Sequence, residues 1–341
     1  MKKIFISLGI GAGVLVVLAF LLGRFALPYI DESLPELPKP ELSEGQRGEL
    51  GIDKNINEET IDKYLGRSDA VYRDVRMLKD PGNYEAIGGD ANLSGYVDGF
   101  EVVPFPYLVN VTGLPEAVGG TYAGETLFTE VEGKYTPNYV ESMAILEDLF
   151  PKDKVIFLMC GGGGYSGMLR RMLIALGWNE EKIYDVGGYW FYKGENAVTV
   201  KRIGVDGKTV YDFYKVPYHE IDFKSLTPVS AGELVDITVE AYEEMISQGR
   251  SFLLFVDQDG CTTADKLRKI VKDYTKSVGG FAYRIMYGDL AGSSLSDTVK
   301  YYPSVAVVKD GQVVKALRSD ADEDAGAYNN YDDFLTWVAS E

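Results

Sequence analysis

The chain has 341 residues, with 34 basic and 52 acidic side chains and a formal net charge of −18. This negative charge argues against nucleic acid or anionic lipid as the partner of the bulk of the protein. A composition with 46% hydrophobic and 12% aromatic residues is that of a globular protein, and the length suffices for two domains with separate cores.

A transmembrane anchor is predicted at residues 1–27. Lys2 and Lys3 precede a nearly continuous apolar run at 4–22. One membrane-spanning helix needs about 20 residues, whereas a cleaved secretory signal has an apolar core of roughly 7 to 15, so an uncleaved anchor is favoured. The two lysines keep the N-terminus cytoplasmic, which places the rest of the chain outside the cytoplasm. A proline-rich, acidic spacer is expected at 28–56.

Predicted strands and helices then alternate over residues 57–195. This alternation is typical of a parallel sheet with helices on both faces. Within it, the glycine-rich and polar stretch 110–137 is expected to be a long loop. The predicted strands are 70–77, 95–105, 154–160 and 182–192, and the predicted helices are 60–65, 138–150 and 168–178.

The most informative segment is VIFLMCGGGGYSGMLRRMLIALGW, in which Cys160 is followed directly by four glycines. It predicts a buried strand, a tight glycine loop and an amphipathic helix. Backbone amides of the loop and the partly positive end of the helix would surround the thiol and favour the thiolate, so Cys160 is expected to ionise easily. The alternative is a small buried cysteine that ends a core strand, with the glycines only turning the chain.

A β-hairpin linker is predicted at 196–230, because Asp206 and Gly207 separate two β-rich runs. A second, smaller α/β domain is predicted at 231–341, with a further hairpin across Asp310 and Gly311. Its helices are expected at 237–248, 264–277 and 331–340, and its strands at 251–256, 281–287, 304–308 and 312–317.

The first domain resembles the rhodanese family. The similarity lies in the strand that ends with Asp-Val-Arg at 74–76, in the segment 95–100, in the loop after Cys160 and in the late Gly-Gly turn at 187–188. It implies that Cys160 is a nucleophile that accepts a sulfane sulfur. It also implies that the persulfide is cradled by the amides of the loop, which are those of Gly161, Gly162, Gly163, Gly164, Tyr165 and Ser166.

The loop departs from the family in one respect. Rhodanese loops carry arginine directly after the cysteine or near the loop end, where this chain has Gly161 and Tyr165. Recognition of thiosulfate or another dianion therefore lacks its usual charge partner. Arg76 is expected to hold the domain together rather than to contact the substrate.

A rival interpretation of the same loop is a dinucleotide-binding fingerprint. Gly162, Gly164 and Gly167 form GxGxxG between a strand and a helix, and Asp185 ends the next strand. That fingerprint usually opens its domain, and nucleotide binding does not explain Cys160.

The second domain is similar to the thioredoxin fold. Cys261 follows a strand and precedes a helix, and Pro303 occupies the place of the family's cis-proline. The family's CxxC is replaced by Cys261 followed by Thr-Thr-Ala, so no resolving cysteine is present. Cys261 is therefore a candidate redox thiol that exchanges singly with a partner, or the fold is kept for binding alone.

The remaining side chains exclude several site classes. His219 is the one histidine, which removes Cys/His and Ser/His catalytic pairs and zinc clusters. The acidic segment 320–326 lacks the glycine and the bidentate acid of a calcium loop. No metal or cofactor is expected, and Cys160 and Cys261 are expected to be separate thiols.

These features predict a single-pass membrane protein with extracytoplasmic domains, a sulfurtransferase that transfers or captures sulfane sulfur through a persulfide on Cys160. The expected partners are a small sulfane-sulfur or thiol substrate, the membrane through the N-terminal helix, and a thiol-carrying protein. Two alternatives stay open: a non-catalytic binding module, and a thiol-disulfide redox protein that uses Cys160 and Cys261.

Overall fold

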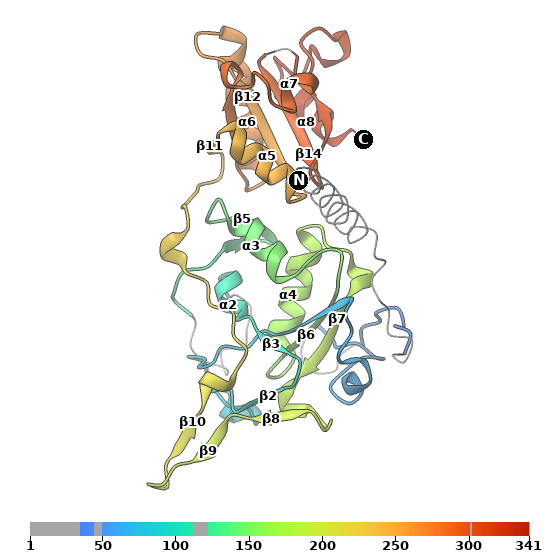
Figure 1. Ribbon diagram of the computed structural model, residues 1–341, viewed down its shortest axis with the longest axis vertical. Coiled ribbons are helices and arrows are strands. Elements are labelled where there is room, and N and C mark those ends of the chain that lie inside the picture. Colours follow the sequence, from blue (N-terminus) through green and yellow to red (C-terminus); the bar gives the residue numbers. More distant parts are fainter. Residues whose placement is uncertain (1–34, 44–49, 112–121, 301, 341) are drawn as a thin grey trace, which may run out of the picture.

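The computed structural model describes residues 35–43, 50–111, 122–300 and 302–340. Two α/β units lie along its long axis, and the C-terminus belongs to the second (Figure 1). No helix in the described ranges is long and apolar enough to cross a membrane. The predicted anchor at 1–27 lies outside these ranges.

The first unit is built on a four-stranded parallel sheet with the order β3-β1-β6-β7. Its strands are β1 Ala70–Asp74, β3 Glu101–Val102, β6 Val155–Cys160 and β7 Ile183–Gly188. A register shift after Leu158 sets Cys160 opposite Gly188. The predicted α/β fold is thereby confirmed.

The two faces of this sheet bury different parts of the chain. Side chains of β6 alternate, so Leu158 joins one core and Phe157 the other. The Leu158 face is covered by three helices, which are α2 Phe105–Leu108, α3 Ser142–Leu149 and α4 Gly164–Ala175. The Phe157 face is covered by residues 52–65, which include the 3-10 helix η1 Ile61–Tyr64.

Part of the predicted spacer is packed against the first unit. Ile52, Asp53 and Ile56 are buried. The Tyr184 hydroxyl donates to the carbonyl of Pro38 at 2.6 Å. Residues 35–43 and 50–56 therefore belong to the folded part of the first unit.

Helix α4 begins four residues earlier than predicted. Gly163, at φ 100°, is its N-cap and turns the chain into the helix at once. Gly164, Tyr165 and Ser166 thus form the first helical turn. The loop after Cys160 consists of residues 161–163 only.

Two hairpins flank the sheet. The predicted long loop contains β4 Phe128–Val131 and β5 Lys134–Pro137, which pair across Glu132 and Gly133, both at positive φ. The predicted hairpin at Asp206-Gly207 is confirmed by β9 Lys201–Ile203 and β10 Thr209–Tyr211, which project from the lower end of the unit (Figure 1). Strand β2 Gly95–Val97 pairs with β8 Ala197–Thr199.

The second unit is the smaller α/β domain predicted at 231–341. Its sheet has the order β11-β13-β12-β14-β15, with β11, β13 and β12 parallel and the last two strands antiparallel. The peptide bond before Pro303 is cis, as the thioredoxin resemblance implies. The strands are β11 Leu234–Asp236, β12 Phe252–Asp257, β13 Ala282–Met286, β14 Ser304–Lys309 and β15 Gln312–Ala316.

Helices cover both faces of this second sheet. Helices α6 Thr262–Ser277 and α8 Tyr331–Ala339 pack on one face, and α5 Val239–Ser247 and α7 Leu295–Thr298 on the other. The two units meet where Arg250, just before β12, pairs with Glu147 of α3 at 3.3 Å. The remaining 3-10 turns are η2 Glu85–Ile87, η4 Glu180–Lys182, η5 Tyr189–Phe191, η6 Phe213–Lys215, η7 Phe223–Ser225, η8 Tyr287–Asp289 and η9 Asp322–Asp324.

Candidate functional site

Cys160 lies where β6 ends and α4 begins, and its side chain is 2% exposed. The amide of Gly163 donates to its Sγ at 3.0 Å, and the Ser166 hydroxyl lies 3.6 Å from the same sulfur. Donors from the loop and from the first turn of α4, at two of the six predicted positions, therefore converge on the thiol.

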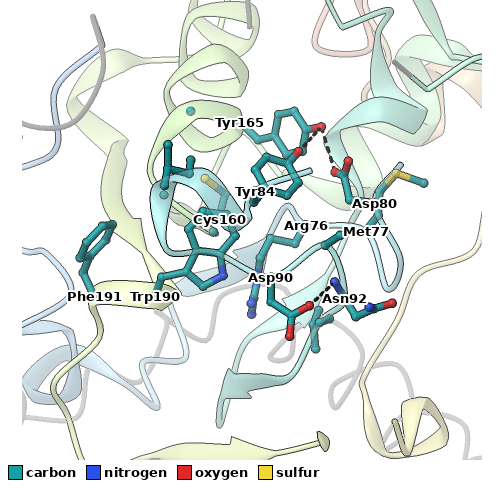
Figure 2. A pocket seen from close by; sticks show the side chains of 16 residues that line it. Arg76, Met77, Asp80, Tyr84, Asp90, Asn92, Cys160, Tyr165, Trp190 and Phe191 are labelled. Atoms are coloured by element: carbon teal, nitrogen blue, oxygen red, sulfur yellow. Dashed lines mark hydrogen bonds between the residues drawn. The ribbon is translucent and has the colours of Figure 1, made fainter. Parts of the chain in front are cut away.

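A cavity of about 350 Å³ opens beside the sulfur (Figure 2). Four segments form its wall: the residues after β1, the segment around η2, the Cys160 loop and the residues after β7. Of the predicted site residues, Cys160, Gly161, Gly162, Gly164 and Tyr165 line it, whereas Gly163 and Ser166 contact the sulfur. The wall also includes residues that the sequence did not single out, which are Met77, Asp80, Tyr84, Ile87, Asp90, Ala91, Asn92, Leu93, Trp190 and Phe191.

The indole of Trp190 covers the glycine loop. The Trp190 amide donates to the carbonyl of Gly161 at 3.1 Å. A methyl group added at Gly161 would lie 2.6 Å from the indole ring, so a side chain there would displace Trp190. The indole of Trp190 thus fills the space that a side chain at Gly161 would occupy. Cys160 lies at the wall of the cavity beside this ring.

Gly188→Ala is expected to destabilise the first unit. An added methyl would lie 2.3 Å from the carbonyl oxygen of Gly161 and 2.8 Å from Cα of Gly162, and backbone atoms cannot move aside cheaply. We expect a loss of about 1 to 3 kcal/mol in the free energy of unfolding, measured by urea denaturation. Gly288→Ala is the control because that position faces open space; equal stability of the two variants would contradict the prediction.

The expectation that Cys160 ionises easily is wrong. Burial raises the pKa of the thiol, and the nearby charge of Asp185 raises it further. The Ser166 amide and hydroxyl and the Gly163 amide act in the opposite direction, but burial outweighs them. The resting thiol is therefore protonated at neutral pH.

The pH dependence of alkylation tests this assignment. We expect the rate of iodoacetamide reaction at Cys160 to rise with a midpoint above that of a cysteine peptide in the same buffers, because the thiolate is the reactive form. Ser166→Ala should move the midpoint higher, because its hydroxyl lowers the pKa of Cys160. A midpoint below that of the peptide would show an activated thiolate instead.

Tyr165 occupies the loop-end position where the rhodanese family has arginine. Its hydroxyl donates to Asp80 at 2.9 Å and lies 3.1 Å from the hydroxyl of Tyr84. Burial raises the pKa of Tyr165 well above its usual value, so the ring stays neutral. This wall of the cavity therefore presents hydroxyl groups and the Asp80 carboxylate in place of a cation.

The dinucleotide interpretation is not supported. Asp185 is fully buried and accepts a hydrogen bond from the amide of Gly187 at 3.0 Å, so it is not placed to bind a ribose. Burial, with the charge of Glu58, raises the pKa of Asp185 to about 7. Gly167 packs against Leu50: a methyl group added at Gly167 would lie 2.6 Å from Cβ of Leu50.

Cys261 lies apart from Cys160. It is the partly exposed N-cap of α6, and both cysteines are free. Strands β6 and β12 both start near the contact between the units. Cys160 is the last residue of β6, and Cys261 lies beyond the far end of β12. Since six strand residues span about 20 Å, the two thiols are not placed to exchange within one chain.

Within the described residues, no cluster of three or more histidine, cysteine or acidic side chains could hold a metal ion. His219 contacts Glu101 at 2.9 Å and takes no part in the cavity.

Comparisons with known proteins give a limited picture. No family model and no curated protein matches the chain. Among solved structures, oxidised thioredoxin from Plasmodium falciparum is 12% identical, with 32% of this chain and 100% of that chain covered and a TM-score of 0.25. Thioredoxin f from spinach chloroplast is 10% identical, with 33% and 96% covered and a TM-score of 0.24. At these values the similarity says nothing about the activity of this chain.

Proposed function

We propose that the first unit is a single-cysteine sulfurtransferase site, in which Cys160 accepts a sulfane sulfur and passes it to a thiol. The observation that carries the proposal is the Sγ of Cys160 at the side of a cavity, with amide and hydroxyl donors from Gly163 and Ser166 converging on it. Such donors stabilise an anionic sulfur without a metal. The added sulfur would extend from Sγ into the cavity.

The reaction divides into two displacements. The Cys160 thiol first loses its proton to solvent. The thiolate then attacks the sulfane sulfur of a persulfide or polysulfide donor; a bond from Sγ to that sulfur forms, and the donor's sulfur–sulfur bond breaks with its electron pair on the departing thiolate. In the second step an acceptor thiolate attacks the outer sulfur and Cys160 leaves as thiolate.

Transfer from benzyl persulfide to glutathione, followed as formation of glutathione persulfide, tests the proposal. We expect Cys160→Ser to lower the protein-dependent rate at least 100-fold, because the nucleophile is lost. Cys261→Ser is the matched control and should keep most of the rate. An unchanged rate in Cys160→Ser would exclude Cys160 as the carrier, and the absence of a protein-dependent rate in the wild type would favour the non-catalytic binding module.

A second candidate function is thiol–disulfide exchange between Cys261 and a thiol-carrying protein. The supporting observation is that Cys261 is partly exposed at the N-cap of a 16-residue helix. The test uses the Cys160→Ser variant and measures whether Cys261 forms a mixed disulfide with oxidised glutathione. The absence of a glutathione adduct on Cys261 would argue against this candidate function.

We further propose, from Lys2, Lys3 and the apolar run at 4–22, that the chain is a single-pass membrane protein with both units outside the cytoplasm. Protease protection of the two units in intact cells tests the orientation. Digestion of the units by added protease is expected, and full protection would contradict it.

A further inference from the structure

Two buried donors on the wall of the Cys160 cavity have no hydrogen-bond partner in the part of the chain that the structure describes. They are Nη1 of Arg76 and Nε1 of Trp190. Arg76 is 7% exposed. In Figure 2 the indole nitrogen of Trp190 is turned toward the Arg76 guanidinium. Because a buried donor without an acceptor costs free energy, two of them in one cavity point to a ligand that supplies acceptors.

The protein fixes both groups in place. Nη2 of Arg76 donates to Asp74 at 2.5 Å and to the carbonyl of Gly95 at 2.7 Å, and the guanidinium lies 4.4 Å from the ring centre of Tyr189. The backbone of Trp190 is fixed by its hydrogen bond to Gly161. The centre of the Trp190 ring lies 5.3 Å from the centre of the Tyr84 ring. Arg76 therefore holds the domain together, as expected, and its Nη1 is also left without a partner at the wall of the cavity, which the sequence did not indicate.

The charges around the cavity limit what can bind. Asp74 already neutralises Arg76. Asp90 pairs with Lys201 at 3.6 Å, and Asp80 accepts the Tyr165 hydroxyl without a cation. No surplus positive charge is left to attract a small dianion such as thiosulfate. The rest of the wall includes the apolar side chains of Met77, Ile87, Ala91, Leu93 and Phe191.

We infer that the cavity selects an organic sulfane-sulfur donor with at most one negative charge, an apolar body and an oxygen-bearing group that accepts from Arg76 Nη1 and Trp190 Nε1. This inference rests on the proposed function and names its substrate class. Benzenethiosulfonate is the probe: its ring suits the apolar wall and its sulfonyl oxygens suit the two donors. The Cys160 thiolate attacks the sulfane sulfur, a bond to Sγ forms, and benzenesulfinate leaves with the electron pair of the broken sulfur–sulfur bond.

The first test compares two donors that load Cys160 in single turnover: benzenethiosulfonate, and benzyl persulfide, which has an apolar body and at most one negative charge but no oxygen atom. Trp190→Phe keeps an aromatic ring and removes the N–H. The rate of loading by benzenethiosulfonate, divided by the rate of loading by the donor without oxygen, should therefore fall about tenfold. Trp337→Phe, in the second unit, is the matched control and should keep the wild-type ratio. We also expect thiosulfate to load the wild type at least tenfold more slowly than benzenethiosulfonate.

The outcomes separate the two claims. Loading of the wild type by no donor would refute the proposed function. Loading by benzyl persulfide with an unchanged ratio in Trp190→Phe would refute only the selectivity inferred here, as would equal rates with benzenethiosulfonate and thiosulfate.

A second test needs no turnover and no change at Trp190. In Cys160→Ser protein labelled with ¹⁵N-tryptophan, three indole N–H signals are expected, from three tryptophans. Saturation with benzenesulfinate should shift one of them strongly, that of Trp190, because its N–H gains an acceptor. Binding without any shifted indole signal, or no binding at millimolar concentration, would overturn the inference.

Discussion

Asp185→Asn is expected to make the protein more stable than the wild type at pH 8, by up to about 4 kcal/mol, with little difference at pH 4. Asp185 is fully buried, and burial together with the charge of Glu58 raises its pKa to about 7. In the unfolded chain the same carboxyl ionises near pH 4. The folded state therefore binds the extra proton between these values, and the wild type loses stability as the pH rises from about 4 to about 7.

Urea denaturation of both proteins at several pH values between 4 and 8 measures this difference. Asparagine does not titrate, so the variant should lack the loss. Asp69→Asn is a control of opposite sign, because Arg67 lowers the pKa of Asp69 and the variant should be less stable than the wild type near neutral pH. If the free energies of unfolding of Asp185→Asn and the wild type change in parallel with pH, ionisation of Asp185 does not destabilise the folded state and the prediction is wrong.

Asp74→Asn is expected to lower the free energy of unfolding by about 3 to 5 kcal/mol, because it leaves the buried charge of Arg76 without a counter-ion. Asp74 is fully buried, and its two oxygens accept from Nε and Nη2 of Arg76 at 2.9 and 2.5 Å. The same pair fixes the guanidinium whose Nη1 has no partner, so the substrate selection proposed above depends on it as well.

Glu181→Gln serves as the comparison in the same denaturation experiment. Its pair with Lys39 should contribute little, because both side chains are exposed and the solvent screens their charges. The double variant Asp74→Asn/Arg76→Met should regain part of the loss, because it removes the unpaired charge. A loss below 1 kcal/mol for Asp74→Asn would mean that the ion pair is not desolvated.

Local patterns predicted much of the fold because they depend on neighbouring residues. The apolar run before Cys160 forms β6, the amphipathic stretch after it forms α4, and the Asp-Gly pair at 310–311 forms the turn between β14 and β15. The hairpin of β4 and β5 was missed because Glu132 adopts positive φ, and glutamate gives no turn signal.

The candidate site was predicted only in part, because its properties depend on tertiary structure. The sequence identified Cys160 and the donors around it. It did not identify Trp190 or Tyr84, which reach the cavity from loops distant in the chain. A tryptophan directly after the Gly-Gly turn at 187–188 was the available signal. The pKa of Cys160 was predicted in the wrong direction, since helix and amide effects are local and burial is not.

The most direct test of the central claim is peptide mass mapping after brief exposure to benzyl persulfide and removal of the excess. We expect the peptide with Cys160 to gain about 32 Da, one sulfur atom, and to lose it on treatment with a reductant. The peptide with Cys261 provides the internal comparison in the same digest. An unmodified Cys160 peptide from folded protein, at donor concentrations that modify a free cysteine peptide, would contradict the account.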